Sequence, residues 1–470
     1  MDLSRRQLLA GLAAPALMQR PAGKPNLVLI LSDDHSVPYL GCYGHTSVRT
    51  PNLDRFAAEG IKLDHCYTAA PQCVPSRTAI MTGRSPVSAR MGRFTSPLPP
   101  DVVSLPELLR EAGYFTGVCG RSFHLDGKRG DVSTPILERH GLQTWDKRVD
   151  YLDRASGAAQ TATKINEFFD KRPGEKPFFL WVNYSDPHHV WDANAVDPPI
   201  DPAKVPVPAH LPDLPGVRND LARYCGEVSR MDGQFQLTLD TIRKRAGMDN
   251  TLVVFMGDNG MAFPHGKGSL YEPGLNVPLL ARWTGRIKPN GASHALMSGE
   301  DIPPTFLEAA GVAKPKSMTG VSQMPVFLGQ AASVRDKVYA ARLCHCGGPL
   351  TETTKANNWD QSRSVRTARY KLIYNAMPNQ EYWPIDSAND PGWQDILAAH
   401  QSGKLAPQFE RAYFMRPRPI WELYDMEADP AELNNVADRA DLAEVRRELT
   451  VAMQEKMMID YDFLPPAVRD

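Results

Sequence analysis

Two short motifs supply oxygen-bearing side chains that could hold a hard metal ion. Asp33 and Asp34 follow the apolar run LVLILS, while Asp258 and Asn259 follow the apolar run TLVVFMG. Carboxylate and amide oxygens, with no thiolate or imidazole pair at zinc spacing, suit Ca²⁺ or Mg²⁺. Neighbouring residues of a strand point to opposite faces, so the two aspartates can share an ion only if the strand ends there. An Asp-Asp pair alone is usually a solvated turn, but the second motif favours a cation site.

A cysteine stands just ahead of a predicted helix in the segment QCVPSRTAIMTGR. Pro75 and Ser76 predict the helix start, which places Arg77 in the first turn. An anion beside Cys73 would then meet backbone N–H groups and a guanidinium, as in a sulfate or phosphate pocket. A helix N-terminus also lowers the pKa of a thiol, which leaves a simple cysteine nucleophile open. Cysteine-dependent phosphatases place their arginine further on, where this chain has Ala79, and this weakens that alternative.

Four basic or histidine side chains lie close to the ends of further apolar runs. They are Arg77, His124, His188 and Lys267. Taken singly, each histidine is equally well explained as a structural residue, and Lys267 is better explained as a solvated loop charge. Because all four stand beside the metal candidates at the ends of apolar runs, one shared site is the better interpretation.

The apolar runs themselves predict the scaffold. Runs such as PNLVLILS and KPFFLWVNYS are typical of strands buried on both faces of a parallel sheet. Between them lie helical segments such as TPNLDRFAAEG, with Thr50 as cap, Pro51 at the first position and Gly60 as the stop. This alternation predicts an α/β sandwich with a mainly parallel central sheet flanked by helices. In such sheets ligands bind beyond the carboxyl ends of the strands, where the polar motifs stand.

The sequence pattern changes beyond about Pro349. The segments VRTARYKLIYN and WELYDMEADP are typical of short alternating strands, and a helix is expected over about 441–458. We therefore expect a catalytic domain over 24–350 and a smaller C-terminal α+β subdomain with an antiparallel sheet over 351–470.

The first residues have the pattern of an export signal. MDLSRRQLLAGLAAPALMQR combines a basic pair, a short apolar run and small residues, which predicts a twin-arginine-like signal over 1–23 cleaved after Ala16. The run is too short for a stable membrane span, and the remaining alternative is a disordered basic N-terminus. We expect a periplasmic or secreted protein. The 470 residues carry a net charge of −1, so nothing in the total indicates a nucleic-acid partner.

The segment CVPSR followed by TAIMTGR resembles the signature of the type I, formylglycine-dependent sulfatases of the alkaline-phosphatase-like superfamily. In that family the cysteine is oxidised to formylglycine by a formylglycine-generating enzyme. Segments such as LVLILSDDHS, FFLWVNYSDPHH, VVFMGDNG and ELYDMEADPAELNNVA extend the resemblance over nearly the whole chain. The stretch DNGMAFPHGKGSLYEPG is most similar to the heparan N-sulfatase (sulfamidase) branch.

The resemblance implies a role for each candidate residue. Its metal ligands, for one Ca²⁺ in preference to Mg²⁺, are Asp33, Asp34, Asp258, Asn259 and the modified Cys73. Arg77 would hold the formylglycine hydrate, and His124 would assist its later breakdown. His188 would donate a proton to the leaving group, and Lys267 would bind the sulfate. One position departs from the family pattern, because the segment GRSFH carries Arg121 where a lysine is usual.

The resemblance also implies the reaction. One hydroxyl of the aldehyde hydrate attacks sulfur, and the other lets the resulting sulfate ester collapse back to the aldehyde. The expected activity is hydrolysis of a sulfate ester or sulfamate on a sulfated sugar or glycosaminoglycan fragment, with N-sulfoglucosamine as one candidate. Two alternatives stay open: a phosphodiester or phosphonate monoester hydrolase of the same superfamily, and a glycan-binding protein whose Cys73 is never modified.

Overall fold

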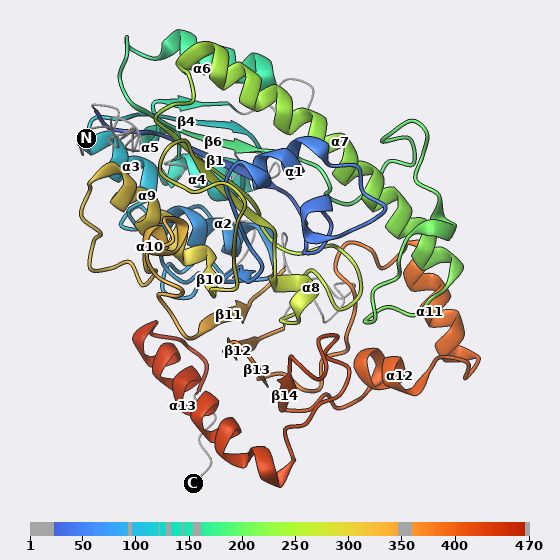
Figure 1. Cartoon of the computed structure of the whole chain (residues 1–470). Helices are drawn as coiled ribbons and strands as arrows, with labels where there is room; N and C mark the ends of the chain where they lie inside the picture. Colours follow the sequence, from blue (N-terminus) through green and yellow to red (C-terminus); the bar gives the residue numbers. More distant parts are fainter. Residues whose placement is uncertain are drawn as a thin grey trace, which may run out of the picture.

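The computed structural model describes residues 23–92, 96–121, 123–127, 133–142, 145–153, 161–345 and 360–465. A central sheet of eight strands dominates this part of the chain (Figure 1). Its strands are β1 (Asn26–Ser32), β2 (Ile61–Leu63), β4 (Phe115–Gly120), β5 (Tyr151–Leu152), β6 (Phe178–Asn183), β7 (Thr251–Gly257), β8 (Leu279–Trp283) and β9 (Gly291–Ser293). Their order is β5-β4-β6-β1-β7-β8-β2-β9, and the five from β5 to β7 are mutually parallel. The predicted mainly parallel sheet is therefore confirmed.

Strand β1 shows why helices must cover both faces of this sheet. Val28 and Ile30 pack into one core, while Leu27, Leu29 and Leu31 pack into the other. Since successive side chains of a strand alternate between faces, an all-apolar strand needs cover on both sides. One face is covered by α1 (Pro51–Ala58), α6 (Thr161–Lys171) and α7 (Pro215–Ala246), and α11 (Pro391–Gln401) packs against α7. The other is covered by α2 (Cys73–Thr82), α3 (Leu105–Glu111), α9 (Ile302–Ala310) and α10 (Met324–Phe327).

Helices α1 and α2 test the predicted helix starts. Helix α1 begins at Pro51 after Thr50, as predicted. Helix α2 begins at Cys73, earlier than the predicted start at Pro75 and Ser76. A proline is tolerated there because the first-turn N–H groups have no partner within the helix. Arg77 consequently lies in the second turn, not in the first.

A second, four-stranded sheet lies below the first in Figure 1 and is antiparallel throughout. Its strands are β11 (Val338–Arg342), β12 (Ser362–Arg366), β13 (Tyr370–Asn375) and β14 (Trp421–Asp425). Helix α13 (Ala443–Ile459) packs against it through Leu449, Met453 and Met457. The predicted antiparallel C-terminal sheet is confirmed. Strand β11 precedes the expected boundary at 350, which itself lies outside the described residues.

Shorter elements complete the described chain. They are β3 (Cys66–Tyr67), β10 (Met297–Ser298), α4 (Ser133–Arg139), α5 (Trp145–Arg148), α8 (Glu272–Leu275), α12 (Pro407–Phe414) and the 3₁₀ turns Gly41–Tyr43, Phe123–Leu125, Pro202–Lys204, Gly299–Asp301 and Ala440–Leu442. Of the helices in the described ranges, none combines the length and apolar composition that crossing a membrane requires. The expected export signal over 1–23 lies, apart from its last residue, outside the described residues.

Candidate active site

Four adjacent parallel strands, in the order β4-β6-β1-β7, end at the same edge of the central sheet. Asp33 follows β1, and Asp258 follows β7 directly beside it. The ladder continues past the strands, because the Asp258 N–H donates to the Ser32 carbonyl at 3.0 Å and the Asp33 N–H donates to the Asp186 carbonyl at 3.2 Å. The backbone therefore brings together the two metal-binding motifs that the sequence predicted.

The side chains of these motifs form one buried group. Asp33, Asp34, Asp258 and Asn259 are all 0% exposed. Asp34 has a φ of 60°, so its side chain leaves the alternation of β1 and turns toward its neighbours. Its backbone N–H donates to Asp258 Oδ1 at 3.1 Å, and its Oδ1 accepts from Asn259 Nδ2 at 2.8 Å. The strand has ended before the aspartate pair, as sharing one ion requires.

The electrostatics of this group are unfavourable without a compensating cation. Burial, together with repulsion from the neighbouring carboxylates, raises the pKa of Asp34 to about 6 and that of Asp258 to about 7. Burial alone would also raise the pKa of Asp33, but Arg121 and Arg77 hold it well below its ordinary range. Two of the three carboxyl groups thus lack enough positive charge around them.

The donor set fits a hard divalent cation. Among the described residues, Asn259 Oδ1 is buried and accepts no hydrogen bond, which is costly for an amide oxygen. An ion held by this oxygen and by the carboxylates of Asp33, Asp34 and Asp258 would satisfy it. Such an ion would also lower the raised pKa values.

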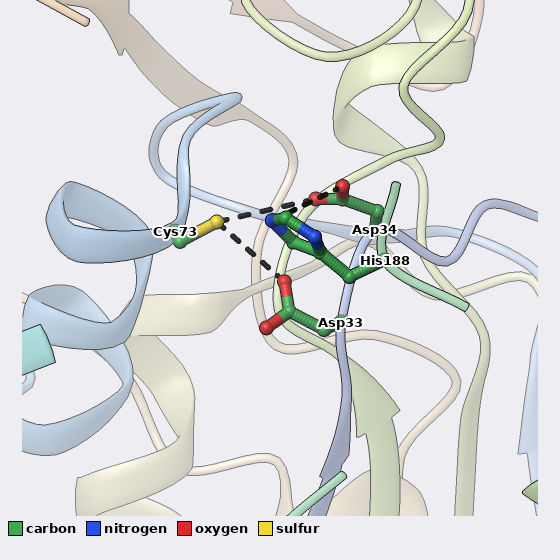
Figure 2. A group of neighbouring side chains, drawn as sticks. All are labelled: Asp33, Asp34, Cys73 and His188. Atoms are coloured by element: carbon green, nitrogen blue, oxygen red, sulfur yellow. Dashed lines mark hydrogen bonds and ion pairs between the residues drawn. The ribbon is translucent and has the colours of Figure 1, made fainter. Parts of the chain in front are cut away.

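Cys73 faces the acidic group from the first residue of α2 (Figure 2). Its Sγ lies 3.5 Å from Asp33 Oδ1 and 3.9 Å from Asp34 Oδ1. The thiol is free and 1% exposed. Burial raises the pKa of Cys73 well above its ordinary value, and the carboxylates add to this. The lowered thiol pKa expected at a helix start is therefore wrong here, and an unmodified Cys73 is a poor nucleophile.

Arg77 links the acidic group to a second strand end. Its Nε donates to Asp258 Oδ2 at 2.9 Å, and its Nη2 donates to Asp33 Oδ2 at 3.1 Å. Its Nη1 donates to Asn183 Oδ1 at 2.5 Å. Every side of this fully buried guanidinium thus has a planar partner, which suits arginine and would not suit lysine.

Arg121 and His124 follow the end of β4 and lie beside the acidic group. Gly120 ends this strand with a φ of 80°, and a Cβ there would lie 2.0 Å from the Asn183 carbonyl oxygen. Glycine therefore lets β4 approach β6 and turn toward the site. Arg121 Nη1 then lies 2.9 Å from Asp33 Oδ2, and His124 is buried close enough to lower the pKa of Asp33.

Lys267 and His188 approach the acidic group beside Asp34. Lys267 Nζ donates to an Asp34 carboxylate oxygen at 2.9 Å and to Asp386 Oδ2 at 2.7 Å. It also lies 3.4 Å from His188 Nε2. Burial and the adjacent Lys267 ammonium lower the pKa of His188 to about 4, so the free enzyme holds a neutral imidazole at pH 7. The ligand atoms of Asp33, Asp34, Cys73 and His188 lie within 4.8 Å of one another.

The structure adds three polar residues that the sequence did not single out. Asn183 is the last residue of β6 and contacts Arg77, and its place at a strand end was the available signal. Asp386 contacts Lys267, and Asp390 lies 2.8 Å from His189 Nε2. These two aspartates lie between β13 and α11, in a segment without strand or helix periodicity, so no pattern could assign them to the site.

Comparisons with known proteins identify the family to which the chain belongs. A model of the sulfatase family matches residues 25–312, and a model described as N-sulphoglucosamine sulphohydrolase, C-terminal, matches residues 263–413. Human arylsulfatase A is 31% identical, with 92% of this chain and 86% of the relative covered. An ulvan-active sulfatase of Formosa agariphila is 29% identical (91% and 74% covered), and human N-sulphoglucosamine sulphohydrolase is 27% identical (88% and 86% covered).

Solved structures show the same fold. A protein in complex with its substrate D-glucosamine-2-N,6-O-disulfate superposes with a TM-score of 0.69 at 20% identity, covering 95% of this chain and all of that one. A 2-O GAG sulfatase gives 0.67 at 20% identity, with 94% and 93% covered. Since the sulfatase model spans the whole central sheet and these relatives cover most of the chain, this protein belongs to the sulfatase family of hydrolases.

Proposed function

We propose that this sulfatase removes sulfate from an ester or sulfamate on a sulfated sugar or glycosaminoglycan fragment, with N-sulfoglucosamine as a candidate substrate. The names of its relatives support this class, because they include enzymes of ulvan, of N-sulfoglucosamine and of sulfated hexosamines. The match of residues 263–413 to the C-terminal model of the N-sulphoglucosamine sulphohydrolases supports the sulfamate in particular.

The observation that carries the proposal is the position of Cys73. Its Sγ stands among two buried carboxylates and His188, in a pocket that also holds Arg77 and Lys267. As a thiol it is protonated and poorly reactive there. We infer that a formylglycine-generating enzyme converts it, and formylglycine supplies a hydrated aldehyde as the nucleophile. The modification explains why a residue so unsuited to act as a thiolate lies at the centre of the site.

The resident cation is proposed to be Ca²⁺. Asp33, Asp34, Asp258, Asn259 and the modified residue 73 would hold it, since oxygen ligands from two strand ends suit a hard ion. When bound, Ca²⁺ supplies positive charge that stabilises the negative charge gathering on oxygen.

The protein's own side chains bind and orient the substrate. Arg121 beside Asp33 and Lys267 beside Asp34 are positively charged and would bind the sulfate oxygens. Arg77 is held by three partners and would fix the side chain of residue 73. His188 would protonate the leaving group, and the negative charge of a bound sulfate would raise its pKa toward the range that this role needs.

The proposed location is the periplasm or the extracellular space. The basic pair, apolar run and small residues of the N-terminal segment support it. Fractionation of the native host, with N-terminal sequencing of the mature protein, tests this location. A cytoplasmic protein that retains its first residues would contradict it.

One expression experiment tests the activity. The chain is co-expressed with a formylglycine-generating enzyme, and the peptide containing residues 72–77 is analysed by mass spectrometry. Turnover is then measured with sulfated mono- and disaccharides, including N-sulfoglucosamine, and with an aryl phosphodiester and an aryl phosphonate. We expect a modified Cys73 and turnover of a sulfated sugar. Preference for the phosphorus substrates would identify a phosphoester hydrolase, and an unmodified thiol without turnover would indicate a glycan-binding protein.

A further inference from the structure

Asp386 is a carboxylate that the chain brings to the active site from outside the central sheet. It lies in the segment between β13 and α11, and its Oδ2 is 2.7 Å from Lys267 Nζ. The Lys267 side chain is 1% exposed, whereas that of Asp386 is 29% exposed. Asp386 is therefore the outer, partly solvent-exposed member of the pair.

The charges around Asp386 leave its negative charge only partly balanced. Lys267 also pairs with the Asp34 carboxylate, so its single positive charge is shared between two carboxylates. The Asp386 Oδ1 atom lies 3.9 Å from His345 Nε2, but burial lowers the pKa of His345 to about 3. His188 Nε2 also lies 3.4 Å from Lys267 Nζ, so Lys267 faces His188 as well as the two carboxylates. Burial alone would raise the pKa of Asp386, but Lys267 holds it below its ordinary range, so the carboxylate is ionised.

We propose that the Asp386 carboxylate makes this pocket selective for singly charged sulfate groups over doubly charged phosphate monoesters. The inference rests on the proposed binding of sulfate by Lys267. A fixed negative charge within a few ångströms of an anion opposes each unit of the anion's charge. A sulfate ester carries one negative charge, whereas a phosphate monoester gains a second near pH 6. Asp386 thus penalises the phosphate dianion more than the sulfate.

The matched variant is Asp386→Asn. Asparagine retains an oxygen for the Lys267 ammonium and tolerates the positive φ of 69° as aspartate does, so only the charge changes. We measure kcat/KM for 4-nitrophenyl sulfate and 4-nitrophenyl phosphate, which share a leaving group. The sulfate-to-phosphate ratio is expected to fall by about tenfold or more at pH 8, chiefly because phosphate turnover rises.

The pH dependence separates charge selectivity from a merely structural effect. Between pH 5 and 8 the sulfate ester keeps its charge, while the phosphate monoester passes from about one to about two negative charges. The wild-type ratio is therefore expected to increase from pH 5 to pH 8 more steeply than that of Asp386→Asn. The control is Glu381→Gln on the same segment, which removes an exposed carboxylate paired with Arg416 and should leave the ratio unchanged.

A binding measurement covers the case in which the variant turns over neither substrate. Calorimetric titration of the purified proteins with methyl sulfate, which carries one negative charge, and methyl phosphate, which carries about two at pH 8, should show methyl phosphate gaining affinity relative to methyl sulfate in Asp386→Asn. An unchanged ratio, by turnover or by binding, overturns the proposal. A wild-type enzyme that hydrolyses no sulfated substrate would instead refute the proposed function, since the relative binding of the two anions is measured independently of turnover.

Discussion

The active site has two walls of different construction. The wall at the edge of the central sheet carries Asp33, Asp34 and Asp258, which are fully buried and each held by several partners. The wall from the C-terminal part of the chain carries Asp386 and Asp390, whose side chains are 29% and 19% exposed and lie closest to Lys267 and His189 respectively. The first wall is built to hold charge in a fixed geometry, and the second is partly exposed to solvent.

This difference follows from where the backbone comes from. Carboxyl groups buried at a strand end are tolerable only when a rigid ladder and a cation compensate their desolvation. A partly exposed carboxylate in a loop loses less hydration than a fully buried one, and the loop can vary without disturbing the sheet. We therefore expect changes in the sheet wall to affect all substrates alike, and changes in the C-terminal wall to alter the choice among them.

The largest effect should come from Cys73→Ala. Turnover of every sulfated substrate is expected to fall by at least about 10³-fold, because the nucleophile is lost. The melting temperature should change by only a few degrees, since one buried sulfur is removed. Cys66→Ala is the control, as it makes the same change at a buried free thiol in β3. An insoluble Cys73→Ala protein would indicate a structural thiol, and full turnover would remove Cys73 from the mechanism.

Removal of divalent cations should lower both stability and activity, because the inferred cation site lies in the wall at the edge of the central sheet. A chelator is expected to lower the melting temperature and abolish turnover, and Ca²⁺ at about a hundredfold excess over its Kd should restore about 2.7 kcal/mol. In Asp258→Asn, which lacks one carboxylate of the buried group, the response to Ca²⁺ should be much smaller. Scanning calorimetry measures the melting temperatures of wild type and variant, and an aryl sulfate assay measures their turnover. If neither chelator nor Ca²⁺ changes the melting temperature of the wild type, no bound cation balances the charge of the buried carboxylates, and the inferred cation site is wrong.

Arg121 should show an intermediate effect. Arg121→Lys keeps the positive charge and is expected to retain turnover within about tenfold, whereas Arg121→Ala should lose about 10²-fold. The reason is that Arg121 contributes charge beside Asp33 and the proposed sulfate position. Steady-state kinetics with one aryl sulfate compares the two variants. Equal losses in both would mean that the planar guanidinium, and not its charge, is required.

Most of the sheet wall could be predicted from the sequence, for a physical reason. Apolar runs such as LVLILS and TLVVFMG reveal buried parallel strands, and the polar residues after them must meet at one edge. Asp33, Asp258 and Arg121 therefore came together as expected. The start of α2 was displaced because Pro75 fits inside a first helical turn as well as at its first position.

The C-terminal wall could not be predicted in this way. Asp386 and Asp390 lie in an irregular segment, and their positions depend on how the second sheet packs against the first. No local periodicity records such long-range packing. The reactivity of Cys73 was also beyond sequence reasoning, because the helix N-terminus would lower the thiol pKa and only the structure shows that burial outweighs it.

The smallest effect should come from Asp390→Asn in the C-terminal wall. Burial alone would lower the pKa of His189, but the Asp390 carboxylate at 2.8 Å raises it above its ordinary value. The ion pair therefore stabilises the fold fully below about pH 6.5, the ordinary pKa of histidine, and loses this contribution as pH rises through the raised pKa. Asp390→Asn should lower the free energy of unfolding by about 1 kcal/mol at pH 6 and by much less at pH 9.

Urea unfolding of wild type and variant at the two pH values measures this difference. His189→Gln should cause a similar loss with the same pH dependence, and the double variant should lose little more than either single variant, because both remove one interaction. If the loss is equal at pH 6 and pH 9, His189 is held as a neutral hydrogen-bond partner. The C-terminal wall would then carry the negative charge of Asp390 without a positive charge on His189.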